Sequence, residues 1–414
     1  MPNPSAQRDF ALEIVNRLRA AGFEALWAGG CVRDQLLGRT PKDYDVATNA
    51  TPEQIRDLFG RRRTLAIGAA FGVVTVLGPR AAGQLDVVTF RSDAAYSDGR
   101  HPDSVTFTTA EEDAARRDFT INGLFYDPVE NRVVDYVNGQ ADIERRVIRA
   151  IGDPRSRIQE DKLRMLRAVR FAAAYEFEIE PATLGAIQEM AAEVTSVSAE
   201  RIGAEVRRMM LDARRAKALE LLRQSNLLPH VLPEVAMLDE SAMNEVKRRL
   251  AGLCEPTLPL ALATLLSHDF AESTAAMETA PAAHALGRRL RFTNREIDGA
   301  QWLLRHASDI AIAPQLPWPR LQRLLIHEAG GELVTLREAI AGKDDPAAAY
   351  CRERLAWPAE RLNPAPLLDG ADLIQHGLAP GPQFAGLLEK VRDAQLIGEI
   401  NSRDEALALI DRLR

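Results

Sequence analysis

Three aspartates in the first quarter of the chain have the spacing of a metal site. Asp43 and Asp45 stand two residues apart in segment 43–47, which is predicted to be a β-strand. Because side chains alternate along a strand, both carboxylates would point to one face. Asp86 lies on a second predicted strand, 84–90, and could supply a third carboxylate. Such oxygens are the ligands of Mg²⁺, and three carboxylates can hold two ions. The competing interpretation is an exposed edge strand with solvated aspartates.

A pair of glycines, Gly29 and Gly30, separates a predicted strand, 24–28, from a predicted helix, 32–37. Two glycines let the backbone approach a ligand closely, and the start of the helix offers N–H groups to a phosphate. Arg33, in the first turn of the helix, could bind the same phosphate through its guanidinium. Alone, the pattern is more typical of a simple tight turn.

The segment Arg116-Arg117-Asp118 places two guanidinium groups beside a carboxylate. The cations suit a triphosphate, and the carboxylate of Asp118 suits a ribose hydroxyl. An ion pair on the protein surface is the alternative interpretation, and this segment without the others favours it.

Residues 160–171 are predicted to form one helix with two different faces. One face gathers Glu160, Asp161, Arg164, Arg167 and Phe171. The other face gathers Leu163, Leu166, Arg170 and Ala173. A carboxylate acceptor beside guanidinium donors can bind the edge of a nucleotide base as a complementary base does. A salt-bridged amphipathic helix is the alternative, and both can hold because the opposite face must be buried.

The elements that carry these residues predict an α+β fold. Strand signals end near residue 142, and helical patterns fill the remainder of the chain. A mixed-sheet domain over 1–145 would therefore be followed by an all-helical remainder, which we divide into 146–217 and 218–414. A chain of 414 residues is too long for one ordinary hydrophobic core, so several domains are expected.

Composition and charge narrow the class of protein. The net charge of −7 argues against a general nucleic-acid binder, but Arg145–Lys217 holds 15 basic and 11 acidic residues. This excess suits a restricted RNA-binding face, and an ordinary solvated helix surface explains it equally well. No apolar run is long enough to span a membrane, and Met1–Phe10 has no apolar signal core. We therefore expect a cytoplasmic protein that does not act at a membrane.

Four segments, in order, give the sequence a resemblance to a known family. They are 29–38 (GGCVRDQLLG), 41–45 (PKDYD), 116–124 (RRDFTINGL) and 160–171 (EDKLRMLRAVRF). The series resembles the nucleotidyltransferase superfamily of DNA polymerase beta, and in particular the bacterial class II CCA-adding enzymes and poly(A) polymerases. Four such segments in family order are a specific signal.

The resemblance implies an enzyme that adds CCA to the 3′ end of tRNA from CTP and ATP, without a nucleic-acid template, and releases pyrophosphate. Asp43 and Asp45 match the metal ligands, with Mg²⁺ as the ion, and Asp86 matches the third acidic position. Asp161 and Arg164 match the residues that read the incoming base. The nucleotide-binding residues would be Gly29, Gly30, Arg33, Arg117, Asp118, Asp161, Arg164, Arg167 and Arg170.

The resemblance also implies a role for each domain. Residues 1–145 would be the catalytic head, 146–217 a helical neck that recognises the nucleotide base, and 218–414 a helical body and tail that bind tRNA. A further segment, Tyr96–Phe107, is similar to the family's mobile loop, which helps the switch from CTP to ATP and so favours complete CCA addition.

Sister activities share these motifs, so poly(A) polymerases and enzymes that add only CC or only A stay as alternatives. Segment 67–76 (IGAAFGVVTV) is more like the tRNA enzymes, and residues 404–414 lack the basic run common in poly(A) polymerases. A non-catalytic RNA-binding relative is the alternative from another class. The sequence keeps the metal-ligand, triphosphate and base-reading positions of the family, which argues against a non-catalytic relative. These positions are Asp43, Asp45, Arg117, Asp161 and Arg164. The dipeptide His268-Asp269 lacks the further ligands that a metal phosphohydrolase needs.

Overall fold

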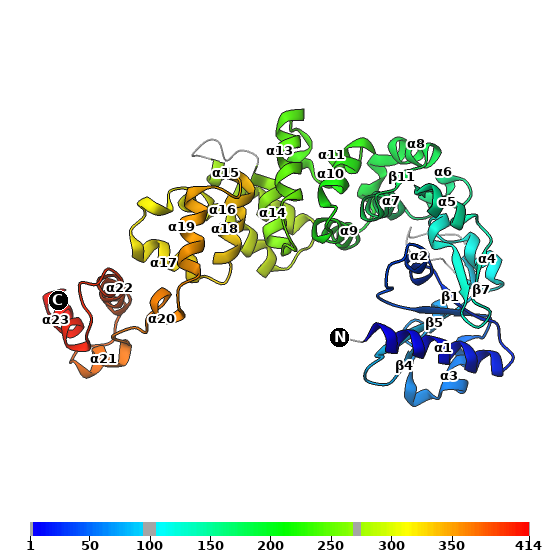
Figure 1. Cartoon of the computed structure of the whole chain (residues 1–414), viewed down its shortest axis with the longest axis horizontal. Helices are drawn as coiled ribbons and strands as arrows, with labels where there is room; N and C mark the ends of the chain where they lie inside the picture. The colour runs from blue at the N-terminus through cyan, green and yellow to red at the C-terminus, as the bar shows by residue number, and fades with distance from the viewer. Residues whose placement is uncertain (1–2, 94–104, 268–274, 414) are drawn as a thin grey trace. The chain divides into compact units, whose positions relative to one another are not determined.

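The computed structural model describes residues 3–93, 105–267 and 275–413 (Figure 1). The chain divides into two compact units, Met1–Met237 and Leu238–Arg414. Most of the predicted mobile loop and the dipeptide at 268–269 lie outside the described residues. The finer division of the chain at residues 145 and 217 stays a prediction.

Unit 1 begins with a seven-stranded sheet in the order β3-β4-β5-β2-β1-β8-β9. β2 and β5 run parallel, and the other neighbouring pairs run antiparallel. The strands are β1 (Ala25–Ala28), β2 (Asp45–Thr48), β3 (Thr64–Leu65), β4 (Val73–Leu77), β5 (Gln84–Thr89), β8 (Leu124–Asp127) and β9 (Arg132–Asp135). The sheet is therefore mixed, and the predicted α+β class is confirmed.

Burial along the strands explains how the sheet is covered. Every residue of β1 and β8 is buried, whereas β4 and β5 alternate between buried and partly exposed positions, with one exposed residue at the start of β5. Helix α1 (Pro4–Ala20) packs on β1 and β2 through apolar residues at helical spacing, and α3 (Pro52–Phe59) packs on β4 and β5. Figure 1 shows α1 and α3 beside the sheet. Asp45 thus stands exposed at the start of β2, and the three residues that follow it in the strand are buried in the core.

Helices follow the sheet within unit 1. They are α5 (Gly139–Arg145), α6 (Pro154–Glu160), α7 (Leu163–Tyr175), α8 (Pro181–Met190), α9 (Ala199–Leu211), α10 (Arg215–Gln224), α11 (Leu228–Val231) and α12 (Pro233–Ala236). A two-stranded parallel sheet, β10 (Val147–Ile148) and β11 (Glu178–Ile179), interrupts this region, which the sequence predicted to be wholly helical. Strands of two residues are too short to leave a periodic signal, which is why the prediction missed them.

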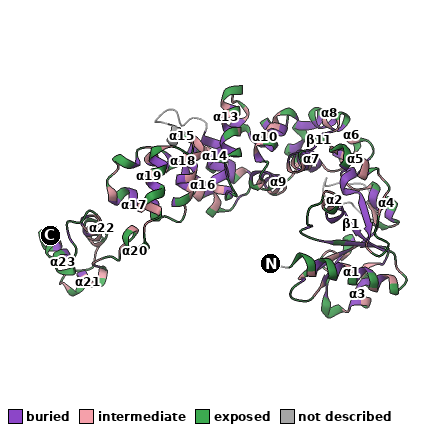
Figure 2. Ribbon diagram, in the orientation of Figure 1, coloured by how far each residue is buried: buried purple, intermediate pink, exposed green. Residues whose placement is uncertain are grey.

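Unit 2 is built from helices in the part of it that the structure describes. They are α13 (Glu240–Ala251), α14 (Leu258–Leu266), α15 (Ala275–Arg289), α16 (Asn294–Ala311), α17 (Trp318–Ile326), α18 (Gly330–Ala341), α19 (Pro346–Leu355), α20 (Ala359–Leu362), α21 (Gly370–Gln375), α22 (Gln383–Leu396) and α23 (Arg403–Leu413). Helix α14 is almost entirely buried and packs against α16 and α18, as the purple ribbon of Figure 2 shows. A separate apolar cluster that includes Leu373, Val391 and Ile410 joins α21, α22 and α23.

Across the described residues, no helix combines the length and the apolar character that crossing a membrane requires.

Candidate active site

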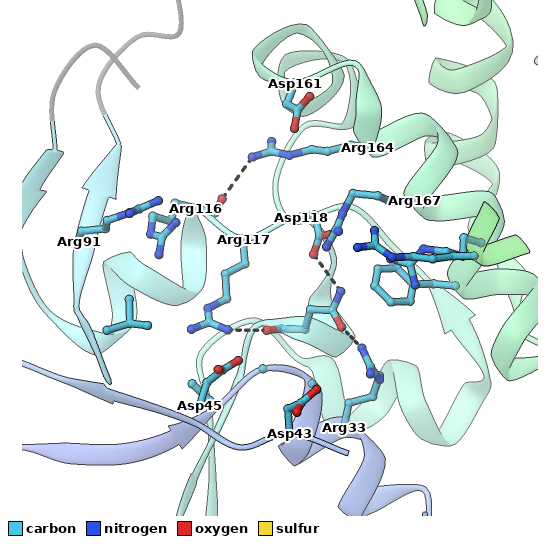
Figure 3. Close-up of a pocket in the computed structure, with 18 residues that line it drawn as sticks. Arg33, Asp43, Asp45, Arg91, Arg116, Arg117, Asp118, Asp161, Arg164 and Arg167 are labelled. Carbon is cyan, nitrogen blue, oxygen red and sulfur yellow. Dashed lines mark hydrogen bonds and ion pairs between the residues drawn. The ribbon is translucent and has the colours of Figure 1, made fainter. Parts of the chain in front are cut away.

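A pocket of about 790 Å³ lies in unit 1, where the sheet meets α4 (Ala110–Ala115) and α7 (Figure 3). All the predicted site residues except Asp86 line it. In Figure 3, Asp43 and Asp45 lie at one end of the pocket, Asp161 and Arg164 lie at the other, and arginines lie between them. The fold therefore brings together predicted site residues that are up to 141 positions apart in the sequence, from Gly29 to Arg170.

The glycine pair forms the turn from β1 into α2 (Gly30–Leu36). Gly29 has φ 69°, a conformation that residues with a side chain rarely adopt, and its N–H donates to the carbonyl of Leu124 at 2.9 Å. A Cβ on Gly29 would lie 2.7 Å from Nη1 of Arg117. Glycine at this position thus lets an arginine of the pocket approach the backbone closely.

The prediction that Asp43 and Asp45 share one strand is wrong for Asp43. Strand β2 begins at Asp45, whose partner on β1 is Ala28, the last residue of that strand. Beyond Ala28 the chain turns into α2, so β1 offers no partner to residues before Asp45. Both carboxylates nevertheless line the same end of the pocket. The convergence that a metal site needs is therefore present without the shared strand.

Asp86 stands beside Asp45 in the sheet but does not line the pocket. Its Oδ1 accepts a hydrogen bond from Oγ1 of Thr75 at 2.6 Å. Burial and the negative charge of Asp86 raise the pKa of the Asp45 carboxyl to about 6, and Asp43 adds to this while Arg117 opposes it. The carboxylate end of the pocket thus concentrates negative charge that a bound cation would stabilise. Among the described residues, no three His, Cys, Asp or Glu side chains are grouped to hold a metal ion.

The prediction of one helix over 160–171 is also wrong. Helix α6 ends at Glu160, Asp161 is extended with φ −147°, and α7 begins at Leu163. Oδ1 of Asp161 accepts a hydrogen bond from the N–H of Leu163 at 3.1 Å, so this side chain satisfies a donor at the start of α7. An aspartate that can bond to the backbone in this way favours a helix start over a helix interior.

Asp161 and Arg164, at the other end of the pocket, already have partners. Oδ2 of Asp161 lies 2.7 Å from Nη2 of Arg201 on α9. Nη1 of Arg164 lies 2.6 Å from Oε2 of Glu160 and also donates to the carbonyl of Arg157. These contacts hold a carboxylate acceptor and a guanidinium donor in place at one end of the pocket.

Helix α7 presents a charged face to the pocket and buries its other face. Arg164, Arg167, Arg170 and Phe171 line the pocket, whereas Leu163 and Leu166 are buried. The predicted grouping of Arg170 with the leucines is therefore wrong. The reason lies on α9, where buried Glu205 accepts from Nε of Arg170 at 2.5 Å and so holds the guanidinium at the pocket wall.

Phe171 is a centre of contact for these cations. The guanidinium carbon of Arg170 lies 4.0 Å from the centroid of its ring, and those of Arg33 and Arg167 each lie 5.2 Å away. Cations over an aromatic face are attracted to it and lose little freedom when a ligand arrives.

A buried aspartate on α4 orients the paired arginines. Asp113 is 1% exposed and accepts from Nη2 of Arg116 at 2.7 Å and Nη2 of Arg117 at 3.0 Å. Although burial opposes ionisation, the charges of Arg117 and then Arg116 lower the pKa of Asp113. The ionised carboxylate fixes both guanidinium groups at the wall of the pocket.

The side chain of Asn122, which was not predicted as a site residue, bonds to the predicted residues Arg33 and Asp118, and Asp118 in turn pairs with Arg167. Its Nδ2 donates to Oδ1 of Asp118 at 2.9 Å, and its Oδ1 accepts from Nη1 of Arg33. Oδ2 of Asp118 lies 2.6 Å from Nη2 of Arg167. Burial opposes ionisation of Asp118, but the charge of Arg167 and these hydrogen bonds lower its pKa. The carboxylate of Asp118 thus links Asn122, which precedes β8, to Arg167 on α7.

Sequence reasoning missed several residues of this site. Asn122 stands inside segment 116–124 but was not selected as a site residue. Arg116 was recognised as a cation that suits a triphosphate but was not included among the nucleotide-binding residues. The other missed residues lie outside the four segments, some of them within ordinary amphipathic helices. They are the pocket residues Arg91 and Arg208 and the supporting residues Asp113, Arg201 and Glu205. The packing of α4 and α9 identifies Asp113, Arg201, Glu205 and Arg208, and the position of Arg91 at the start of β6 (Arg91–Asp93) identifies Arg91.

Eight arginines and four aspartates line one pocket whose chemistry suits a nucleoside triphosphate on a carboxylate-bound cation. A mixed sheet with Asp45 at the start of one strand and Asp43 just before it, beside a Gly-Gly turn and followed by helices, defines a nucleotidyltransferase of the DNA polymerase beta type.

Comparisons with known proteins agree with this class. The family model described as "Poly A polymerase head domain" matches residues 25–149, and one described as "Probable RNA and SrmB- binding site of polymerase A" matches residues 176–238. A CCA-adding enzyme of Limosilactobacillus fermentum is 31% identical over 408 residues, which cover 95% of this chain and 94% of that enzyme. Poly(A) polymerase I of Haemophilus influenzae is 38% identical over 244 residues, which cover 55% and 53%.

Solved structures extend the similarity to the whole fold. The Bacillus stearothermophilus CCA-adding enzyme in complex with CTP matches with a TM-score of 0.80 and 29% identity, covering 100% of this chain and 98% of that one. The Thermotoga maritima CCA-adding enzyme complexed with tRNA shares the fold, with a TM-score of 0.65 and 18% identity over 98% of this chain and 95% of that one. The chain belongs to the CCA-adding enzyme family, and it is an enzyme.

Proposed function

We propose that this enzyme adds CCA to the 3′ end of tRNA, with CTP and ATP as substrates, and that it does so in the cytoplasm. The observation that carries the proposal is the extent of similarity. The CCA-adding enzyme of L. fermentum aligns over 95% of this chain, whereas the poly(A) polymerase of H. influenzae aligns over 55%. In this proposal residues 1–145 catalyse the transfer, 146–217 contribute base recognition, and 218–414 bind tRNA.

The arginines of the pocket bind the incoming nucleotide. Arg116 and Arg117, oriented by Asp113, face the triphosphate together with Arg33. Asp118, which is held by Arg167 and Asn122, accepts a hydrogen bond from a ribose hydroxyl. Because these groups are already held by buried partners, little conformational freedom is lost when the nucleotide binds.

Base choice depends on the other end of the pocket. Asp161 offers acceptor oxygens and Arg164 offers donors, so the pair can complement the edge of cytosine or adenine. Each exchanges part of its present hydrogen bonding, to Arg201 and Glu160, for bonds to the base. A base that cannot supply matching groups leaves a charged partner unsatisfied, which costs binding energy.

Enzymes of this class use a divalent metal ion, and we propose Mg²⁺ held by Asp43 and Asp45. The fit rests on the donors: two carboxylates at one end of the pocket, and an Asp45 pKa raised by burial and by Asp86. When bound, the ion would polarise the α-phosphate and the attacking hydroxyl. Substrate phosphates and water would complete its coordination.

The reaction joins the 3′-oxygen of the RNA to the α-phosphorus of the nucleotide, breaks the bond to the β-phosphate, and releases pyrophosphate. The chain's own residues position the two reactants and neutralise charge; a covalent intermediate with a side chain is not needed. Arg33, Arg116 and Arg117 stabilise the negative charge that develops on the leaving pyrophosphate.

The test offers purified enzyme three tRNA transcripts, which end before CCA, after C, and after CC. Each receives labelled CTP, ATP or both, with Mg²⁺, and the products are sized on a gel. Addition that stops at CCA on all three transcripts supports the proposal. Long A-tails would instead indicate a poly(A) polymerase, and addition of only CC or only A would indicate a partial enzyme. No addition by soluble, folded protein would indicate an RNA-binding relative.

A further inference from the structure

A second hollow, of about 730 Å³, meets the nucleotide pocket at the carboxylate pair. The two share six residues, which are Gly30, Arg33, Asp43, Asp45, Arg170 and Arg208. Away from this common edge, the second hollow has basic side chains of its own: Arg39 and Lys42 from the segment between α2 and β2, and Arg207 from α9.

We propose that this second hollow binds the last phosphodiester groups of the RNA that is extended, an inference that rests on the proposed function. In transfer to a phosphorus, the attacking and leaving oxygens lie roughly in line on opposite sides of it. If the triphosphate occupies the arginine-rich pocket, pyrophosphate leaves within that pocket. The 3′-hydroxyl must then reach the carboxylate pair from the other side, and the second hollow provides room there.

Among the residues that line only the second hollow, three are basic (Arg39, Lys42 and Arg207) and two are acidic (Asp34 and Asp212), a balance that favours a phosphate. Lys42 is exposed, directly precedes Asp43, and has no acidic partner among the residues that the structure describes. The nearby carboxylate of Asp34 is already engaged, because Nη2 of Arg33 lies 2.8 Å from it and the hydroxyl of Tyr175 donates to it at 2.9 Å. It therefore offers less repulsion to a phosphate than a free aspartate would.

The second basic group is held in place by an aromatic ring. The guanidinium carbon of Arg39 lies 4.7 Å from the centroid of the Tyr175 ring, and its Nη1 lies 3.5 Å from the carbonyl of Ala174. Arg33 contacts the same ring, at 4.6 Å. The ring of Tyr175 thus contacts Arg33, which lines both hollows, and Arg39, which lines only the second. These contacts hold both guanidinium groups in place before RNA binds.

The donors of the second hollow recognise the backbone and not the base. Guanidinium and ammonium contacts to phosphate position a nucleic acid but carry no sequence information. In the proposed reaction the terminal base of the RNA changes after every addition. A subsite that ignores the base can therefore hold the end through each step, while base reading stays with Asp161 and Arg164 in the other pocket.

The test measures steady-state kinetics with tRNA that ends before CCA, for Lys42→Ala and Arg39→Ala. We expect KM for the tRNA to rise about tenfold for each variant, since each removes a charge-assisted contact, while KM for CTP stays within about twofold. The dependence of log KM for tRNA on log salt should become shallower by about one unit. Lys42→Arg should restore most of the affinity, and Arg62→Ala, an exposed arginine outside both hollows, is the matched control.

The inference is overturned if KM for tRNA is unchanged, if KM for CTP rises in parallel, or if Arg62→Ala has the same effect. A second measurement does not depend on catalysis: tRNA with 4-thiouridine as its last nucleotide is photo-cross-linked to the wild-type enzyme, and the attached peptides are identified by mass spectrometry. Cross-links to residues 39–42 or 174–175 support the subsite, and cross-links confined elsewhere contradict it. Normal CCA addition without those cross-links would overturn this inference alone, whereas cross-links without addition would overturn the proposed function alone.

Discussion

Asp45 and Asp86 face each other across the parallel pair β2 and β5, and this contact makes the carboxylate end of the pocket electrostatically costly. Burial and the neighbouring charge raise the pKa of Asp45 to about 6, from an ordinary value of 3.8. The folded protein therefore retains a proton that the unfolded chain releases between these two values. Stability consequently falls as the pH rises through this window, and the whole loss is present at pH 7.

Because ionisation of Asp45 lowers the stability of the folded protein, we make a prediction for Asp45→Asn. In EDTA at pH 7 the variant should have a higher Tm than wild type, because it lacks the costly ionised carboxylate; near pH 3.5 the difference should shrink. With Mg²⁺ and substrates, transfer should fall by at least about 100-fold, because a metal ligand is lost. Thermal unfolding at the two pH values and the gel assay check both parts. A variant that is less stable than wild type at pH 7, or fully active, would contradict the assignment.

Arg164 carries the second prediction at this scale. Arg164→Ala should reduce discrimination between CTP or ATP and the incorrect nucleotides by about 10- to 100-fold, because a bidentate contact to a base edge contributes about 1–3 kcal/mol of selectivity. The measurement is kcat/KM for each of the four nucleoside triphosphates. Arg155→Ala removes an exposed arginine that pairs with Glu189 outside the pocket, so it serves as the control. Unchanged preference in Arg164→Ala would show that base choice lies elsewhere.

At the scale of elements, α9 supports the pocket from behind. Its Glu205 is 1% exposed and accepts from Arg170 at 2.5 Å and Arg208 at 2.6 Å, and its Arg201 holds Asp161. Both arginines that Glu205 binds line the pocket of Figure 3 and the second hollow. Packing α9 against α7 therefore aligns the cations that face both proposed reactants.

Glu205→Ala should show this dependence. Removing one member of a buried ionic cluster leaves the others uncompensated, so we expect a loss of about 3–5 kcal/mol in the free energy of unfolding, measured with urea. Glu189→Ala breaks a pair in which both side chains are more than half exposed, and it should cost about 1 kcal/mol or less. Equal effects of the two substitutions would mean that the cluster on α9 contributes no more than an exposed ion pair.

At the scale of the whole molecule, charge is distributed unevenly. The chain has a net charge of −7, yet eight arginines line one pocket of unit 1. A local concentration of cations in an acidic protein attracts anionic substrates to one place and disfavours general binding of nucleic acids. All residues of both hollows lie within Met1–Met237.

This leads to a prediction for a fragment of residues 1–237. It should fold cooperatively by itself, because unit 1 is compact and has its own core, and its Kd for CTP should stay within about threefold of the full chain's. Its KM for tRNA should rise, because residues 218–414 are proposed to bind tRNA. Circular dichroism, calorimetric CTP titration and the gel assay provide the readouts. A fragment that folds but no longer binds CTP would place part of the nucleotide site in unit 2.

The sequence by itself predicted the fold class, the family and many of the site residues of this protein. The four segments carry groups whose chemistry requires particular residue types close together, such as the glycine turn at Gly29, the carboxylates Asp43 and Asp45, and the guanidinium series on α7. Strand and helix periodicity predicted the α+β fold, and the resemblance carried by the four segments predicted the enzyme family and many of the residues that line the pocket. The catalytic roles assigned to them stay predictions until they are measured.

Only the tertiary structure decided which partners hold these groups. Asp161 is extended and bound by Arg201, 40 residues away, and Arg170 reaches the pocket because of Glu205, 35 residues away. The end of β1 at Ala28 leaves Asp43 outside the strand, and the β2–β5 register sets Asp86 beside Asp45. Such contacts join elements that are distant in sequence. Many helices of this chain are amphipathic, and only their packing determines which helix supplies the partner of a given site residue. Local periodicity predicts which face of a helix is charged, but it does not predict which residue of another element will pair with that face.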